Sequence, residues 1–253
     1  MADMDFERRF GGMARLYGAD RLARLAAVHV CVVGIGGVGS WAVEALARSG
    51  IGRLTLVDLD HVAESNMNRQ IHALESTLGQ AKVLAMAERV ALINPDCRVR
   101  TVEEFVTPEN VQDIVPGCDA LVDAIDQLKP KAALLAHCRR QGFAVVTTGA
   151  AGGKTDPSRI RVDDLARSSH DPLAAKLRAE LRRNHGFPRE ANVLFGVDCV
   201  YSPEPVKRPL AAACDVEEHA PQGLSCAGYG SSVCVTGAFG FAAASRVLAI
   251  LVR

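Results

Sequence analysis

The sequence has no net charge that would attract a partner of either sign. Its 253 residues include 29 lysine and arginine against 29 aspartate and glutamate side chains, so the formal charge is zero. A nucleic acid would therefore have to be held by a local basic patch.

The N-terminal segment 1–12 mixes acids with arginines and lacks an apolar run, so we expect no secretory signal peptide.

The eight cysteines include no CxxC pair, and this argues against a ribbon-type zinc site. Several of them lie inside apolar runs, where a thiol packs as a small hydrophobic group. A chain of this size does not need disulfide bonds for stability. We therefore expect a protein of the reducing cytoplasm.

The most hydrophobic segment, residues 233–252, is short of a convincing membrane span. Arg246 interrupts it, and glycines stand at positions 237 and 240. We expect a helix that is buried in the fold or in a dimer interface, rather than a transmembrane segment. Peripheral membrane association through this helix stays open.

Apolar runs alternate with helical patterns between residues 28 and 150. Strands are predicted at 28–33, 53–57, 98–102, 120–124 and 144–148, and helices at 7–26, 40–48, 80–92 and 130–141. Strands that alternate with helices indicate a parallel sheet covered on both faces. The predicted fold is α/β, a Rossmann-like doubly wound sheet.

The C-terminal third has a less regular pattern. We expect a strand near 160–162, one short helix within 166–190 and a last helix from about residue 231. Four prolines lie in the loop-like stretch 202–225, and we predict a flexible segment within 184–225. Residues 1–253 are read as a single domain.

A glycine-rich turn follows the first strand and precedes a helix, which is the setting of a phosphate-binding loop. The turn, GIGGVG, contains Gly34, Gly36, Gly37 and Gly39. Asp58 ends the next strand, where a carboxylate can accept hydrogen bonds from a ribose. NAD and ATP fit these features equally well, and a turn without a ligand is a third interpretation.

Polar residues further along the chain favour ATP. Asn66 and Arg69 follow the ribose carboxylate, Lys82 stands near the start of a helix, and Asp126 follows another strand. Taken singly, each is an ordinary surface residue. Together, the cations can neutralise a triphosphate and the carboxylate can hold Mg²⁺, whereas the two phosphates of NAD are met mainly by backbone amides.

The chain resembles the ubiquitin-activating-enzyme-like (E1-like, ThiF-type) ATP-binding superfamily. The matching motifs are ARLYG (14–18), GIGGVG, LVDLD, NMNRQI, GQAK and AID. The resemblance implies that Asp58 binds the ribose and that Asn66, Arg69 and Lys82 bind the phosphates. It also implies that Asp126 coordinates Mg²⁺. Arg15 would reach across a homodimer to the terminal phosphate of the partner's ATP.

A narrower set of motifs is similar to the bacterial tRNA threonylcarbamoyladenosine dehydratases. They are RFGGMARLYG, GIGGVGSWAVEALARSGIG, NRQIHAL, INPDCRV, KPKAALL, GAAGGKTDP and DPLAAKLR. This resemblance implies ATP-dependent closure of a hydantoin ring on a modified adenosine beside the tRNA anticodon. It also implies an association with a cysteine desulfurase and its sulfur acceptor.

Two further features carry open alternatives. Cys199 and Cys226 flank the irregular segment, and each is either a thioester-forming thiol or a packed one. The stretch 154–189 holds nine cations against five acids, which fits an RNA-binding patch or a solvated helix face. For the RNA-binding interpretation, combined replacement of Arg178, Arg182 and Arg183 is expected to weaken tRNA binding without affecting ATP.

Three classes of function remain at this point. The first is an ATP-dependent tRNA-modifying cyclase. The second is an activator of a ubiquitin-like sulfur carrier, which would adenylate the C-terminal glycine of a small protein. The third is an NAD-dependent oxidoreductase, against which Arg69, Lys82 and Asp126 argue.

Overall fold

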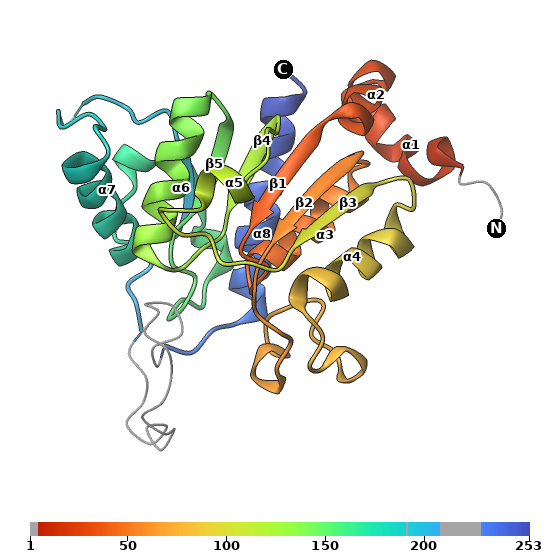
Figure 1. Ribbon diagram of the computed structural model, residues 1–253, viewed down its shortest axis with the longest axis horizontal. Coiled ribbons are helices and arrows are strands. Elements are labelled where there is room, and N and C mark those ends of the chain that lie inside the picture. Colours follow the sequence, from red (N-terminus) through yellow and green to blue (C-terminus); the bar gives the residue numbers. More distant parts are fainter. Residues whose placement is uncertain (1–4, 191, 208–228) are drawn as a thin grey trace.

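A seven-stranded sheet, in the order β3-β2-β1-β4-β5-β7-β6, forms the centre of the computed structural model, which describes residues 5–190, 192–207 and 229–253 (Figure 1). Its strands are β1 (His29–Val33), β2 (Arg53–Val57), β3 (Arg98–Val102), β4 (Ala120–Asp123), β5 (Ala144–Thr148), β6 (Arg161–Asp164) and β7 (Asp198–Tyr201). Neighbouring strands are parallel except β6, which runs antiparallel to β7. The predicted doubly wound, mainly parallel sheet is confirmed.

The helices follow the expected order. They are α1 (Phe6–Tyr17), α2 (Ala19–Ala27), α3 (Gly39–Arg48), α4 (Lys82–Ile93), α5 (Val111–Ile114), α6 (Leu128–Gln141), α7 (Pro172–Asn184) and α8 (Val233–Leu251). Short 3₁₀ turns lie at η1 (Glu64–Asn66), η2 (Glu75–Thr77), η3 (Pro157–Arg159) and η4 (Leu165–Arg167). The single helix expected over residues 7–26 is wrong, because Gly18, with φ of 96°, separates α1 from α2.

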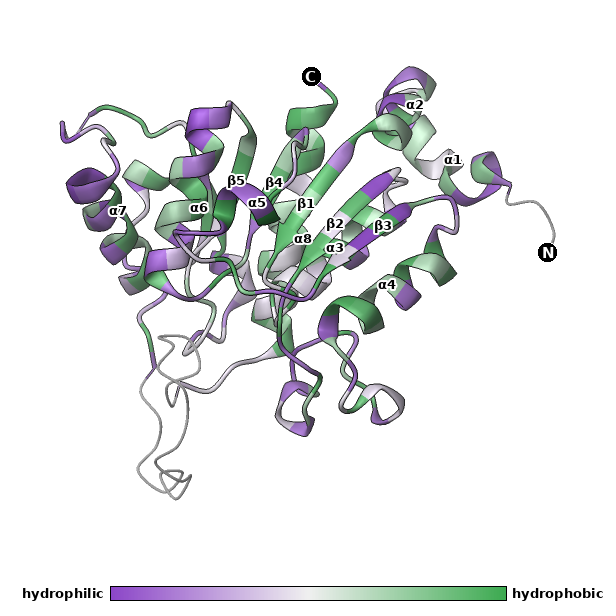
Figure 2. Cartoon of the chain, viewed as in Figure 1, coloured by the Kyte–Doolittle hydropathy of each residue, from purple (hydrophilic) through white to green (hydrophobic). Residues whose placement is uncertain are grey.

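Each face of the sheet has its own hydrophobic core. Successive side chains of a strand point to opposite faces, so Val30 and Val32 pack with α3, α4 and α8, whereas Cys31 and Val33 pack with α5, α6 and α7. In Figure 2 the central strands are mainly hydrophobic in colour, whereas α7 carries much hydrophilic surface. The central strands β1, β2, β4 and β5 are therefore buried on both faces, as their apolar runs predict.

Helix α8 is long and apolar enough to cross a membrane by length and composition. It nevertheless packs along α3 and the sheet, with Val235, Phe239 and Val247 fully buried. A side chain at Gly240 would lie 2.5 Å from the carbonyl oxygen of Val38, so this glycine lets α8 approach α3 closely. One side of the helix is thus buried in the fold, and the expectation that it is not a transmembrane segment stays a prediction.

The C-terminal third contains a strand that the sequence pattern does not reveal. Strand β7 lies within the stretch 184–225, pairs with β5 and β6, and is buried at Cys199 and Val200. This part of the stretch is therefore an ordered part of the sheet. Residues 208–225 lie outside the described residues, and the flexible segment stays a prediction there.

The strand order determines where a ligand can bind. From β1 the sheet continues through β2 and β3 on one side and through β4 and β5 on the other. The connections therefore leave the carboxyl ends of β1 and β4 in opposite directions and open a crevice between them. The glycine-rich turn after β1 and the loop after β4 form this crevice.

Candidate nucleotide-binding site

A cavity of about 1200 Å³ lies at the carboxyl ends of β1, β2, β4 and β5. Most of the predicted site residues line it: Gly34, Gly36, Gly37, Asp58, Asn66, Arg69, Lys82 and Asp126. The fold therefore brings together residues that are as much as 92 positions apart in the sequence, from Gly34 to Asp126. Gly39 and Arg15 are not among the lining residues.

The glycines of the turn have different structural roles. Gly34 has φ of 87°, and a side chain there would lie 2.8 Å from the carbonyl oxygen of Ala124. A side chain at Gly39 would overlap the carbonyl oxygen of Gly34, so Gly39 serves the turn itself. A side chain at Gly36 would meet no atom of the described part of the chain within 4 Å. Among the described residues, no side chain caps the start of α3, which leaves amide groups for an anion in the cavity.

Asp58 is held in a fixed orientation at the end of β2. One carboxylate oxygen accepts from the backbone N–H of Ile35 at 2.6 Å and the other from that of Asp60 at 2.8 Å. Burial raises the pKa of Asp58 above its usual range, while the nearby Lys82 opposes this shift. The carboxylate is thus placed beside the glycine-rich turn, where it can accept hydrogen bonds from the hydroxyl groups of a sugar.

The two predicted phosphate-binding cations already have protein partners. The Arg69 guanidinium donates to the Ser65 carbonyl at 2.6 Å and to Oδ1 of Asn68 at 2.9 Å. Lys82 Nζ lies 2.7 Å from Oδ2 of Asp60. Asp60 was not among the residues predicted to contact Lys82. An incoming triphosphate would have to compete with this carboxylate for Lys82.

The backbone around Arg69 ties the loop after β2 to two helices. The Arg69 carbonyl accepts from Nε1 of Trp41 on α3 at 2.9 Å and from the hydroxyl of Thr236 on α8 at 3.4 Å. Oδ1 of Asn66 accepts from the backbone N–H of Ala63 at 3.1 Å and shapes η1. These contacts position the loop before any ligand binds.

Asp126 lies in the loop between β4 and α6 and is half-buried in the cavity wall. Within the described ranges, no group of three or more His, Cys, Asp or Glu side chains is placed to hold a metal ion. A single carboxylate still fits Mg²⁺, because that ion takes one or two carboxylates and completes its shell with phosphate oxygens and water. The site therefore suits a metal that arrives with a phosphate ligand.

The structure does not bring Arg15 to the cavity of its own chain. Arg15 is exposed on α1, which lies at the edge of the sheet opposite the loop that carries Asn66 and Arg69 (Figure 1). A role for Arg15 at the site would require a second copy of the chain. Its contribution across a homodimer stays a prediction.

Further segments that line the cavity were missed from the sequence. They are residues 104–106 after β3, 148–152 at the end of β5, and 229–231 before α8. Phe105 exposes 48% of its surface there, which is unusual for a large aromatic side chain. The rule that ligands bind at the carboxyl ends of parallel strands would have found the first two segments.

Cys199 is a packed thiol. It is fully buried in β7, and burial raises the pKa of its thiol far above the usual range. A buried thiol in this state is a poor nucleophile, which favours the packed interpretation. Cys226 lies outside the described residues.

Several cations of the stretch 154–189 are internal contacts. Lys154 is 1% exposed and donates to the carbonyls of Ser202 and Glu204 at 2.6 and 2.7 Å. Two half-buried arginines are similarly engaged: Arg178 donates to the Ser168 hydroxyl, and Arg182 donates to the Pro188 carbonyl at 3.0 Å. The count of nine cations therefore overstates the charge at the surface. Combined replacement of Arg178, Arg182 and Arg183 would also disturb folding.

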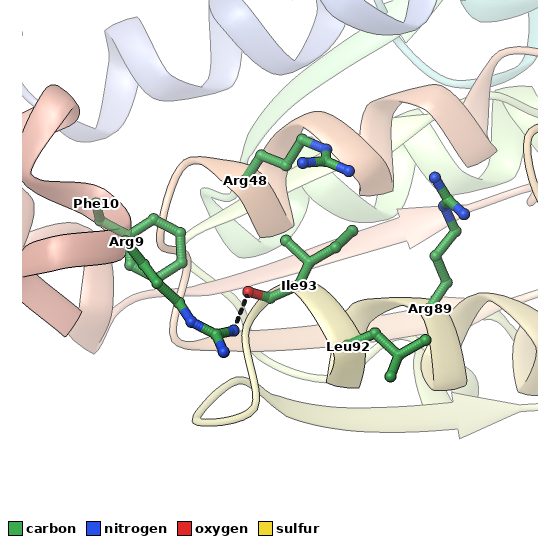
Figure 3. A pocket seen from close by; sticks show the side chains of 6 residues that line it. All are labelled: Arg9, Phe10, Arg48, Arg89, Leu92 and Ile93. Atoms are coloured by element: carbon green, nitrogen blue, oxygen red, sulfur yellow. Dashed lines mark hydrogen bonds between the residues drawn. The ribbon is translucent and has the colours of Figure 1, made fainter. Parts of the chain in front are cut away.

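A second, smaller cavity of about 490 Å³ lies between α1, α3 and α4 (Figure 3). Arg48 and Arg89 both pair with the buried Glu44, at 2.7 and 2.6 Å. Arg9 donates to the Ile93 carbonyl at 2.9 Å. These contacts connect the first turns of α1 to the C-terminal end of α4, and α3 to α4, and none of the three arginines belongs to the predicted site.

His72 makes stability depend on pH. It is 2% exposed, and neither ring nitrogen has a hydrogen-bond partner in the described structure. Burial, with Lys82 and Arg89 nearby, lowers the pKa of His72 from 6.5 to about 4. Because the folded-state pKa is depressed, the stabilisation is complete above pH 6.5 and is lost as the pH falls towards 4.

We expect His72→Leu to reduce the decrease in the free energy of unfolding over this pH interval by as much as about 3 kcal/mol. Urea unfolding at a series of pH values would measure the effect. His61→Leu, which replaces an exposed histidine, is the matched control and should keep the wild-type slope. An identical pH dependence in His72→Leu and the wild type would contradict the assignment.

Comparison with known proteins places the chain in a family. The sequence model of the ThiF family matches residues 11–253. The tRNA threonylcarbamoyladenosine dehydratase of Escherichia coli is 51% identical over 249 residues, which cover 96% of this chain and 93% of that protein. The protein of the same name from Haemophilus influenzae is 46% identical over 257 residues, covering 100% and 97% of the two chains.

The structural comparison agrees with the sequence comparison. A crystal structure of Escherichia coli tRNA N6-threonylcarbamoyladenosine dehydratase in complex with ATP superimposes with a TM-score of 0.88 at 48% identity. The match covers 99% of this chain and 96% of that one. The chain therefore belongs to the ThiF family, and within it is similar along its whole length to the tRNA threonylcarbamoyladenosine dehydratases.

Proposed function

We propose that this protein is an ATP-dependent dehydratase that cyclises threonylcarbamoyladenosine in tRNA. The observation that carries the proposal is the cavity at the carboxyl ends of the strands, where Asp58, Arg69, Lys82 and Asp126 meet beside a glycine-rich turn. These side chains are suited to a nucleoside triphosphate. The similarity to the dehydratases, along the whole chain, supports the choice of substrate.

The proposed reaction activates the carboxylate of the threonine moiety. Its oxygen attacks the α-phosphorus of ATP, pyrophosphate leaves, and an acyl-adenylate forms. A carbamoyl nitrogen then attacks the acyl carbon, loses its proton and expels AMP, which closes the five-membered hydantoin ring. One water is lost overall from the modified nucleoside. Because the nucleophile and the electrophile belong to one molecule, the protein has mainly to hold them in place and neutralise charge.

Each of these side chains of the cavity has a separate role in the reaction. Asp58, already oriented by two backbone N–H groups, accepts hydrogen bonds from the ribose hydroxyls. Arg69 and Lys82 neutralise the phosphates, Lys82 by exchanging its contact with Asp60 for a phosphate oxygen. Asp126 would hold Mg²⁺, which when bound offsets negative charge on the phosphates.

ATP should bind to the protein, and NAD should not. The cations and the extra carboxylate around the turn suit three phosphates and a metal ion better than a pyrophosphate that needs mainly backbone amides. Isothermal titration calorimetry with ATP–Mg²⁺ and with NAD would measure this difference. Lys82→Met is the control for site-specific binding and should weaken the ATP signal. Tight NAD binding with no heat from ATP would reject the nucleotide assignment.

The substrate is tested directly with purified protein, ATP and tRNA that carries the modified adenosine. We expect mass spectrometry of the digested nucleosides to show loss of one water from threonylcarbamoyladenosine, with AMP and pyrophosphate as products. The alternative function, activation of a ubiquitin-like sulfur carrier, predicts adenylation of the C-terminal glycine of a small protein and an unchanged nucleoside. That outcome would overturn the proposal.

The proposed assembly is a cytoplasmic homodimer in which Arg15 of each copy completes the site of the other. The exposure of Arg15 on α1, away from the cavity of its own chain, supports this arrangement. We also propose a functional connection with a cysteine desulfurase and its sulfur acceptor, on the basis of the sequence resemblance alone. Pull-down with the desulfurase would test that connection.

A further inference from the structure

A buried ion pair lies under the loop that carries Asp126. Lys131 Nζ, from the first turns of α6, lies 2.9 Å from Oδ2 of Asp123 at the end of β4. Both side chains are 0% exposed. Removing two charges from water is costly, and an apolar pair of similar volume often stabilises a fold as well or better. Stability alone therefore does not explain the pair. Its hydrogen bonds to the neighbouring backbone give a better explanation.

The contacts of this pair converge on Ile125, the residue before Asp126. Lys131 Nζ donates to the Ile125 carbonyl at 2.9 Å and to the Asp123 carbonyl at 3.3 Å. The Ile125 N–H donates to Oδ1 of Asp123 at 3.2 Å. Thr147 on β5 completes the cluster, with its hydroxyl donating to Oδ2 of Asp123 at 2.6 Å. Both polar groups of Ile125 are thus bound by the ion pair.

The glycine-rich turn holds the same loop from the other side. The Ala124 N–H donates to the Val33 carbonyl at 2.9 Å. The Ala124 carbonyl lies where a side chain at Gly34 would be only 2.8 Å away. The loop is therefore fixed between the turn and the ion pair. A shift of its backbone would move Asp126 relative to the phosphate-binding turn.

We propose that Lys131, with Asp123 and Thr147, is a positioning device that fixes Asp126 for the metal of ATP–Mg²⁺. None of the three residues lines the cavity, so they act through the Asp126 loop and not on the ligand. The proposal rests on the proposed function in one respect, that Asp126 holds the metal. Outer-shell groups of this kind orient the carboxylates that bind metal ions.

The test measures how much Mg²⁺ strengthens ATP binding. We expect Lys131→Met, which keeps the length of the side chain and removes the charge, to reduce this metal-dependent gain in affinity by about 10- to 100-fold. ATP binding in the presence of EDTA should stay near the wild-type value. Thr147→Val should act in the same direction with a smaller effect. Titration calorimetry with and without Mg²⁺ gives both values for each variant.

Arg246→Met is the matched control. It removes the ion pair between α8 and Asp198 of β7, with Nε and Oδ2 2.6 Å apart, and neither residue lines the cavity. A loss of general stability would affect this variant as well, whereas loss of positioning would not. We expect Arg246→Met to keep the full effect of Mg²⁺ on ATP binding.

Asp126→Asn is measured in parallel to separate the two assignments. If Asp126→Asn loses the effect of Mg²⁺ while folded Lys131→Met keeps it, the positioning role is overturned and the metal role stands. If Asp126→Asn keeps the effect, the metal role is wrong and the positioning role falls with it. Should Lys131→Met fail to fold, Thr147→Val decides, and an unchanged metal effect in that folded variant overturns the proposal.

Discussion

Replacement of Asp126 by alanine is expected to reduce turnover by about 10²- to 10³-fold or more, to the limit of detection. Asp126 is the predicted metal ligand in the cavity wall, between the glycine-rich turn and α6. Without it, the charge on the triphosphate is poorly offset, and attack by a carboxylate meets electrostatic repulsion. Release of pyrophosphate under saturating ATP and modified tRNA would measure the loss.

The control for this experiment is Glu64→Ala. Glu64 is an exposed carboxylate that lines the same cavity but has no assigned role. Removing the Glu64 carboxylate changes the charge of the cavity by the same amount as removing the Asp126 carboxylate. We expect at most a small change in turnover for Glu64→Ala. Normal turnover in Asp126→Ala, or an equal loss in both variants, would show that no specific metal contact is made by Asp126.

A mixture of two inactive variants is expected to regain activity when their subunits exchange. Arg15→Ala lacks the residue offered to the partner, and Asp126→Ala lacks a residue of its own cavity. In a mixed dimer one site carries both defects and the other is intact. With random exchange half of the dimers are mixed, so activity should return to about a quarter of the wild-type value.

The mixture of Lys82→Met with Asp126→Ala is the control. Both residues line the cavity of their own chain, so every mixed dimer has a defect in each site and should stay inactive. Sedimentation would establish the oligomeric state, and differently tagged subunits would verify exchange. A strictly monomeric protein, or no recovery after verified exchange, would refute the role of Arg15 across the dimer.

Local sequence patterns determined most of the sheet. The strands predicted at 53–57, 98–102 and 144–148 have the observed bounds, because apolar and β-branched residues between polar turns favour the extended conformation. Strand β7 was missed because four residues carry too little pattern by themselves. It forms a strand because β5 and β6 supply its hydrogen-bond partners, and that neighbourhood exists only in the folded chain.

The same division applies to the site. The glycine-rich turn and the polar residues that follow the strands could be predicted from local sequence, because parallel strands bring their carboxyl ends to one edge. The pairing of the charges could be seen only in the folded chain: Lys82 with Asp60, Lys131 with Asp123, and Lys154 with buried carbonyl groups. Charged side chains have the same appearance in a sequence whether they are solvated or buried. Their pairing depends on distances that the packing of the helices against the sheet sets.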